Sequence, residues 1–299
     1  MSSNERTIMV EYLTKIYGKR KKVPIDMSPR LNFKQFFTPQ KYSQIMIDAL
    51  DIPFPNKIID LAIGGGSLLI EAIKRWENST YYGNDIDEKC CENICKNYKN
   101  IKKCFNQDIF LKSTIKTIKK EIGKVDLCVG NPPFHLINQD NDIKDILKSY
   151  KLDKQYKSNY IPAEVIFILQ CLEILKTHGT LALILPDGFF VNSYLKNFRK
   201  FLIENYTVEK IIELPSNIFE KTDAKTHILV LNKSKPFQNN IISLIKDLHT
   251  INISKDNAIH RMNYSFYSIL NKYEKYKNIS SLDIDFIRGK SKYLIKNFK

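Results

Sequence analysis

Short apolar runs alternate with segments of helical length through most of the chain, and this alternation limits the folds open to it. The runs are residues 57–63, 80–85, 124–130, 179–186, 208–215 and 226–232. Segments with helical periodicity, such as 67–76 and 163–175, separate several of them. This pattern is typical of a mixed, mostly parallel sheet covered by helices on both faces, so we expect an α/β fold. The last two runs lack a helix-length spacer, which predicts an antiparallel hairpin at one edge.

The pattern weakens after residue 236 and divides the chain into three predicted parts. With 299 residues there is room for one large α/β domain and a smaller attachment. We predict a helical and basic segment at 1–32, a catalytic domain at 33–236 and a basic C-terminal tail at 237–299. The tail is rich in Lys, Asn, Tyr and Ile, with one segment of helical character at 264–276.

The chain is strongly basic. It holds 47 Lys and Arg residues against 32 Asp and Glu residues, a formal net charge of +15. Such an excess favours a polyanionic partner, because each phosphate that is neutralised releases a condensed counterion. Lysine- and isoleucine-rich chains also arise from AT-rich genomes, so charge alone leaves both explanations open.

The sequence gives no sign of a membrane or secretory protein. No apolar run reaches the roughly 20 residues that a membrane-spanning helix requires. The N-terminus lacks the basic start and apolar core of a signal peptide. We therefore expect a cytoplasmic protein without a membrane partner, associated with the nucleoid if the host is bacterial.

Four of the six cysteines lie close together in the sequence: Cys90, Cys91, Cys95 and Cys104. A zinc site prefers two close pairs, and no second pair matches the spacing of Cys91 and Cys95. Reduced structural thiols are the better interpretation, and no metal is predicted.

A glycine-rich segment follows the first apolar run and opens a helix, from Asp60 to Ser67 with glycine at positions 64, 65 and 66. Glycines let the backbone bend tightly and approach a ligand, and a loop after the first strand is the expected ligand site of an open α/β sheet. Leu69 stands where a dinucleotide-binding motif has its third glycine, and the Lys-Ser/Thr pair of a P-loop is absent. The Asp60 carboxylate suits a ligand with an ammonium group.

Two further acids follow: Asp85 ends the run 80–85, and Asp108 ends what we expect to be the third strand. Asp85 lies 25 residues after Asp60, and a carboxylate there can accept hydrogen bonds from both ribose hydroxyls of an adenosine. Asp87 has a better role as the cap of the following helix. Asp108 can accept a hydrogen bond from an adenine amino group, with Ile109 beside the ring. Each acid alone also suits an ordinary strand end, but three at successive strand ends favour a nucleoside site.

The segment Asn131-Pro132-Pro133-Phe134 directly follows another apolar run. An adenine amino group is a poor nucleophile because its lone pair is delocalised into the ring. Acceptors aimed at its N–H bonds make the nitrogen more pyramidal and direct the lone pair at a methyl donor. The Asn131 side-chain oxygen and the Pro132 carbonyl are suitable acceptors, held in place by the two prolines. Phe134 offers a flat face for stacking a base.

In this order the motifs resemble the N6-adenine DNA methyltransferases of restriction–modification systems, in the γ-type arrangement of type I modification subunits and fused type II enzymes. That family has a Phe-Thr-Pro element before the glycine loop, and here it stands within Gln35–Pro39. The segments 164–190 and 214–231 resemble its later helix–turn–strand and hairpin. The resemblance covers about residues 33–232 and implies a Rossmann-like S-adenosylmethionine-dependent methyltransferase fold.

The resemblance also implies the reaction and completes the candidate site. It implies S-adenosylmethionine as cofactor and methyl transfer to N6 of a flipped-out adenine in duplex DNA. It places Thr38 over the methionine portion of the cofactor and Phe219 against the base. The cofactor-binding candidates are Thr38, Asp60, Ala62, Gly64, Gly66, Asp85, Ile86, Asp108, Ile109 and Asn131. The catalytic candidates are Asn131, Pro132 and Phe134, and the base-stacking candidates are Phe134 and Phe219.

The chain departs from the family after the hairpin. The family usually carries a target-recognition domain there or receives one from a partner subunit, and residues 233–299 are too few for a typical fused domain. We therefore expect a separate specificity subunit or target-recognition domain, with a truncated family member as the alternative.

Proteins with three other functions share parts of this sequence pattern. Some ribosomal RNA guanine-N2 methyltransferases also use Asn-Pro-Pro-Phe, and His135 resembles them. Protein glutamine methyltransferases share Asn-Pro-Pro, usually followed by Tyr, and need no basic surface. A non-catalytic methyltransferase-fold subunit of a defence complex is the third alternative. The elements around Thr38 and Phe219 favour the DNA enzymes, and the intact residues 131–134 argue against loss of activity.

Overall fold

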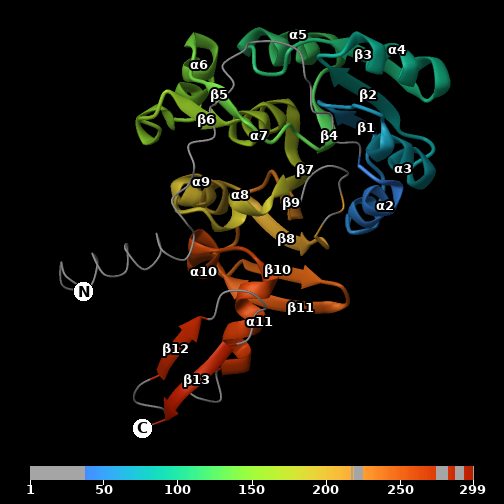
Figure 1. Ribbon diagram of the computed structural model, residues 1–299. Coiled ribbons are helices and arrows are strands. Elements are labelled where there is room, and N and C mark those ends of the chain that lie inside the picture. The colour runs from blue at the N-terminus through green and yellow to red at the C-terminus, as the bar shows by residue number, and fades with distance from the viewer. Residues whose placement is uncertain (1–37, 217, 219–224, 274–281, 287–292, 299) are drawn as a thin grey trace. The chain divides into compact units, whose positions relative to one another are not determined.

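The computed structural model describes residues 38–216, 218, 225–273, 282–286 and 293–298, and the chain divides into two compact units (Figure 1). The larger unit is Lys34–Ile269. The smaller combines the two chain ends, and its described part holds the antiparallel strands β12 (Leu282–Phe286) and β13 (Tyr293–Phe298). The segment predicted at 1–32 lies outside the described residues.

A nine-stranded sheet forms the centre of the larger unit. Its strands, in spatial order, are β11 (His249–Ser254), β10 (Ile241–Lys246), β8 (Thr207–Glu213), β9 (Thr226–Asn232), β7 (Leu175–Pro186), β4 (Val125–Gly130), β1 (Lys57–Asp60), β2 (Thr80–Asp85) and β3 (Ile101–Asn106). Neighbours are parallel except at β7–β9, β9–β8 and β10–β11. The hairpin predicted from 208–215 and 226–232 is present as β8 and β9, and the antiparallel pair β10–β11 lies beyond it at the edge.

Helices cover both faces of this sheet, as the apolar runs predicted. The helices are α2 (Gln40–Asp48), α3 (Ser67–Arg75), α4 (Glu88–Asn97), α5 (Lys112–Ile122), α6 (Asn141–Ser149), α7 (Ala163–Ile174), α8 (Asp187–Val191), α9 (Lys196–Asn205), α10 (Lys255–His260) and α11 (Tyr264–Tyr273). Successive strand residues point to opposite faces, so Ile58 joins the core beneath α2, α3 and α4, and Ile59 joins the core beneath α5, α7 and α9. The predicted α/β fold is confirmed.

Helix α7 lies deepest in the larger unit. Eleven of its 12 residues are buried, and the helix is apolar around its whole circumference apart from three side chains, those of Glu164, Gln170 and Glu173. A helix that is apolar on all sides must be enclosed on all sides. Because α7 runs into β7, next to β4, it supports the part of the sheet from which the predicted catalytic turn emerges.

The sheet continues past residue 236, where the sequence predicted the start of a basic tail. Strand β10 pairs in parallel with β8, with Leu244 opposite Ile211, and β11 follows in a hairpin. Half of this hairpin is solvent-exposed, and its polar residues interrupt the apolar pattern. The buried Leu244 and Ile253 nevertheless extend the core to this edge.

An excursion separates β4 from α7. After the predicted catalytic turn the chain forms β5 (Leu136–Asn138), α6, a 3-10 turn at Asp153–Gln155 and β6 (Tyr160–Pro162). Strands β5 and β6 pair antiparallel as a small separate sheet. Asp140 begins α6 by accepting a hydrogen bond from the backbone N–H of Ile143, as capping side chains do.

One arginine joins three segments behind the sheet. Arg199 of α9 is fully buried and donates to four backbone carbonyls, those of Phe189 (3.0 Å), Asn192 (2.8 Å), Ile259 (3.2 Å) and His260 (2.9 Å). Burial lowers the pKa of Arg199 to about 10, so the guanidinium stays protonated at neutral pH. It holds α8 and the end of α10 against α9.

We predict that Arg199→Met destabilises the protein, because it leaves these four carbonyls without their donor. A buried acceptor without a partner costs about 1–3 kcal/mol, and with partial relaxation we expect a total loss of about 3 kcal/mol. The melting temperature should then fall by roughly 6–12 °C in a thermal melt. Lys200→Met, on the exposed side of the same helix, is the control and should change stability by less than about 0.5 kcal/mol. Equal melting temperatures for the two variants would contradict this role of Arg199.

Candidate active site

The strand registers bring the ends of β1, β2 and β4 to one edge of the sheet. Asp60, the last residue of β1, lies opposite Gly83 of β2 and Val129 of β4. Adjacent strands are about 4.8 Å apart, so the loops that follow Asp60, Asp85 and Gly130 emerge side by side. The strand order also reverses between β1 and β4, since β2 and β3 lie on one side and β4 and β7 on the other. Open α/β sheets bind their ligands at such a point.

The glycine-rich segment bends sharply between β1 and α3. Gly64 and Gly66 have φ values of +49° and +78°, which L side chains rarely adopt. A Cβ on Gly66 would lie 2.1 Å from Cδ1 of Ile94, so α4 packs directly against the bend. A Cβ on Gly64 would meet no atom within 4 Å. The backbone at Gly64 therefore borders open space, as a ligand-binding loop requires.

Asp85 joins the end of β2 to this bend. Its Oδ2 accepts from the backbone N–H of Gly64 at 2.8 Å, and its Oδ1 accepts from that of Asp87 at 2.9 Å. Each carboxylate oxygen has a second lone pair, so Asp85 can still accept hydrogen bonds from a ligand. Asp87 caps α4 as predicted, since its side chain accepts from the N–H of Lys89. Ile86 between the two acids is exposed.

Asp60 is a buried acid beside this bend. It is 1% exposed, and its Oδ1 accepts from the backbone N–H of Ala62 at 2.9 Å. Burial raises the pKa of Asp60 to about 7, the Ala62 N–H lowers it, and the nearby Asp85 raises it. No basic side chain of the described residues lowers the pKa of Asp60. A cationic group bound beside Asp60 would stabilise its carboxylate.

The segment after β3 contains the third acid. Asp108 is half-buried, its Oδ1 accepts from the backbone N–H of Phe110 at 2.9 Å, and its carbonyl accepts from the Thr114 hydroxyl. Ile109 is buried in the core. The Phe110 ring meets the His135 ring edge-on at 6.3 Å between centroids. This contact brings the end of β3 close to the residue that follows the turn 131–134.

The turn after β4 contacts the segment before α2. Asn131 Nδ2 donates to Oγ1 of Thr38 at 3.2 Å, although 93 positions separate them in the sequence. Thr38 and Pro132 are buried, and Phe134 is half-buried against the core beneath α2 and α3. The structure therefore brings together Thr38 and Asn131, two of the predicted cofactor-binding residues. Phe219 lies outside the described residues.

Two buried amide side chains near these loops were not predicted from the sequence. Asn84 lies within β2 and Gln170 within α7, and both donate to backbone carbonyls next to the predicted acids. The one signal in the sequence is a polar residue inside an apolar run. Such a residue also fits many other roles, so the pattern alone does not identify it.

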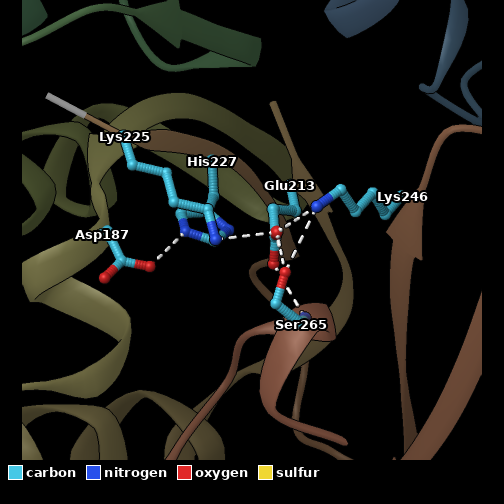
Figure 2. Close-up of polar contacts among 6 residues, drawn as sticks. All are labelled: Asp187, Glu213, Lys225, His227, Lys246 and Ser265. Carbon is cyan, nitrogen blue, oxygen red and sulfur yellow. Dashed lines mark hydrogen bonds and ion pairs between the residues drawn. The ribbon is translucent and has the colours of Figure 1, made fainter. Parts of the chain in front are cut away.

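A row of polar side chains crosses the same edge of the sheet from β7 to β10 (Figure 2). Its members are Asp187, Glu213, Lys225, His227, Lys246 and Ser265. His227 is fully buried, and its Nε2 lies 2.7 Å from Oδ1 of Asp187. The Phe190 ring packs on the imidazole at 4.7 Å between centroids.

Glu213 is the centre of this row. Its side chain is fully buried, and one carboxylate oxygen pairs with Nζ of Lys225 at 2.7 Å and Nζ of Lys246 at 2.9 Å. Ser265, in the first turn of α11, donates to the carboxylate from its backbone N–H at 2.9 Å and from its hydroxyl. Burial alone would raise the pKa of Glu213, but these partners lower it to about 2. Glu213 thus ties β8, β10 and the start of α11 together.

Comparison with known proteins identifies the sequence family. Residues 31–288 match the family described as N-6 DNA Methylase. The methylase subunit of the type I restriction enzyme MpnII of Mycoplasma pneumoniae is 28% identical over 258 residues, covering 77% of this chain and 46% of that protein. The type II methyltransferase M.HincII of Haemophilus influenzae is 28% identical over 224 residues, covering 74% of this chain and 41% of that protein. The chain spans about half the length of these relatives.

Solved structures share the fold at low sequence identity. A modification subunit of a putative type I restriction enzyme from Vibrio vulnificus superposes with a TM-score of 0.57 at 14% identity, covering 95% of this chain and 60% of that chain. A putative class I S-adenosylmethionine-dependent methyltransferase from Listeria monocytogenes superposes with a TM-score of 0.58 at 20% identity, covering 92% and 79%. The predicted methyltransferase fold is therefore confirmed.

We predict that the contribution of Glu213 to stability depends on pH. Its folded-state pKa of about 2 lies below its ordinary value of 4.5, so the stabilisation is present above pH 4.5 and is lost as the pH falls toward 2. At pH 7, Glu213→Gln should cost about 2 kcal/mol, less than a fully buried ion pair because both lysines are partly solvated. The difference in melting temperature between wild type and variant should shrink between pH 5 and pH 3. A difference that stays constant over this range would contradict the assignment.

Proposed function

The chain belongs to the N-6 DNA methylase family, and we propose that it transfers a methyl group from S-adenosylmethionine to N6 of a flipped-out adenine in duplex DNA. One observation carries the proposal. The Asn131 turn, the glycine bend and Asp85 occupy the ends of three adjacent strands, and Thr38 is hydrogen-bonded to Asn131 at the same edge. A methyl donor and its acceptor must meet within one such site.

The residues at this edge fit the cofactor. S-adenosylmethionine would supply a methyl group on a sulfonium sulfur, which is an excellent leaving group. Asp60, which has no cationic partner among the described residues, would hold the ammonium group. Asp85 would accept from the ribose hydroxyls and Asp108 from the adenine amino group. The other residues of the proposed cofactor site are Thr38, Ala62, Gly64, Gly66, Ile86, Ile109 and Asn131.

The turn 131–134 would prepare the target base. The Asn131 side-chain oxygen and the Pro132 carbonyl would accept from the two N6 hydrogens and direct the nitrogen lone pair toward the methyl group. The fixed φ of the prolines and the Thr38 contact hold this turn in advance, so little reorganisation is needed at the moment of reaction. Phe134, and Phe219 by resemblance, would stack on the base after it leaves the duplex.

The setting of the reaction follows from the relatives. They include methylase subunits of type I restriction enzymes and type II methyltransferases. We therefore propose a role in a restriction–modification or related defence system in the cytoplasm, with sequence choice supplied by a specificity subunit or a separate target-recognition domain. Within the described residues, no helix combines the length and the apolar character needed to cross a bilayer.

Mapping methylated adenines in the genomes of cells with and without the gene tests the proposed function, because every native partner is present there. Loss of N6-methyladenine at one sequence motif is the expected result. In parallel, transfer of labelled methyl groups by the purified chain is measured on duplex DNA, ribosomal RNA and protein. Transfer to RNA alone would refute the proposal, whereas cofactor binding with unchanged genomic methylation would favour a non-catalytic subunit.

We predict that Asn131→Ala lowers the rate of methyl transfer by at least about 100-fold, because a preorganised group that stabilises the transition state is worth that much in other enzymes. Cofactor affinity should stay within a few-fold of wild type, since Asn131 acts mainly on the base. Single-turnover transfer and calorimetric binding measure the two effects separately. Asn205→Ala removes an exposed amide from α9 and serves as the control; a full rate for Asn131→Ala would exclude the proposed role.

We predict that affinity for S-adenosylhomocysteine, which keeps the ammonium group, falls as the pH is lowered from 8 to 6. Without ligand the pKa of Asp60 is about 7. Below this pH the acid is protonated and must release its proton to pair with the ammonium group, so the dissociation constant should rise toward tenfold per pH unit. Asp60→Asn should bind more weakly at pH 8 and lose this dependence. An unchanged pH profile in the variant would assign the effect to another group.

A further inference from the structure

Three side-chain amides brace the loops at the ends of β1, β2 and β3. Asn84 Nδ2 donates to the carbonyls of Leu61 at 3.1 Å and Gln107 at 3.0 Å. Gln170 Nε2, from the buried helix α7, donates to the carbonyls of Ile109 at 2.9 Å and Leu111 at 3.1 Å. Each amide therefore uses both of its hydrogens on two different carbonyls.

The third amide braces the loop between them. Asn106 Nδ2 donates to the carbonyls of Asp85 at 3.1 Å and Ile86 at 3.0 Å. It lies at the end of β3, beside the strand whose terminal acid it supports. Unlike the other two amides, Asn106 is exposed to solvent.

The six carbonyls are not scattered over the fold. Leu61 follows Asp60, Asp85 and Ile86 are themselves in the proposed site, and the residues at 107, 109 and 111 surround Asp108. Asn84 adds a further link, because its own carbonyl accepts from the N–H of Ile63 in the glycine bend at 2.9 Å. These side-chain amides thus fix the peptide planes of all three loops that carry the acids, without any contribution from a ligand.

The cost of burial indicates that these amides have a specific task. Asn84 is 1% exposed and Gln170 is 3% exposed, and Gln170 lies in a helix whose other core-facing residues are almost all apolar. An amide loses its hydration when it is buried, which is favourable only if hydrogen bonds replace the lost water. Each N–H donated to a loop carbonyl replaces a hydrogen bond to water, whereas the buried Oδ1 of Asn84 has no partner among the described residues. An apolar side chain would avoid this cost, so the amides are explained by the loop geometry that they fix.

We infer that Asn84, Asn106 and Gln170 are positioning residues that hold the three loops ready for the nucleoside half of the cofactor. The inference rests on the proposed function, since it assumes that these loops bind an adenosine. Loops that are ordered before binding do not lose conformational freedom upon binding, and the ligand binds more tightly for that reason.

The test measures binding of two ligands to the full chain. S-adenosylhomocysteine contains the nucleoside and the amino acid, whereas methylthioadenosine contains the nucleoside alone. Gln170→Met, Asn84→Ala and Asn106→Ala should each weaken both ligands by the same factor, about 10- to 100-fold, as removal of supporting partners does around metal ligands. Asn232→Ala is the matched control, because Asn232 Nδ2 also donates to a carbonyl, that of His178 at 3.1 Å, at the opposite edge of the sheet.

The outcomes separate this inference from the proposed function. If the wild-type chain binds neither ligand, the proposed function is wrong. If the wild type binds both and the variants bind as tightly as Asn232→Ala, the positioning role is wrong, even where melting temperatures have fallen. Weakening of S-adenosylhomocysteine alone would also overturn it, because the methionine half would then be affected. Asn106 is exposed, so Asn106→Ala should fold. If the variants of the buried Asn84 and Gln170 do not fold, the binding measured for Asn106→Ala tests the inference.

Discussion

The parallel pairing of β1 with β2 and β4 is the constraint on which the rest of this structure depends. Parallel strands point their carboxyl ends the same way, so one register decides which loops become neighbours. Here it joins the glycine bend, the loop of Asp85 and the turn that starts at Asn131. The hydrogen bond from Gly64 N–H to Asp85 then fixes two of these loops against each other. The loops at this edge of the sheet are therefore held in place by the protein itself.

Buried polar groups concentrate at this edge, and each is handled differently. Asp60 is an acid whose burial raises its pKa to about 7. Glu213 is neutralised by lysines and by the first turn of α11. Asn84 and Gln170 are neutral, and the amide nitrogen of each donates to two carbonyls, while the buried Oδ1 of Asn84 has no hydrogen-bond partner among the described residues. The two buried acids thus differ, although both end strands of one sheet: Glu213 on β8 is paired with lysines, whereas Asp60 on β1, with three strands between them, has no basic partner among the described residues.

Local patterns in the sequence predicted much of the fold and part of the site. The apolar runs predicted the central strands because buried strands need continuous apolar residues, and Asp60 and Asp85 were identifiable because they belong to such runs. Strands β10 and β11 were not predicted, because a half-exposed edge hairpin mixes polar and apolar residues. The amides of Asn84 and Gln170 were also missed, since their acceptors lie 23 and about 60 positions away and become neighbours only in the folded chain. The roles of the predicted site residues remain predictions.

The close contact between Gly66 and the Ile94 side chain means that substitutions at these two positions depend on each other. A side chain at position 66 needs both the left-handed backbone and the space now filled by Ile94. Asparagine tolerates that backbone, yet it fits only if the Ile94 side chain moves away or is replaced by a smaller one. The order of substitutions therefore matters. A protein that loses Gly66 first is strained, whereas one in which residue 94 is first replaced by a smaller residue is not. Positions 66 and 94 should accordingly change as a pair.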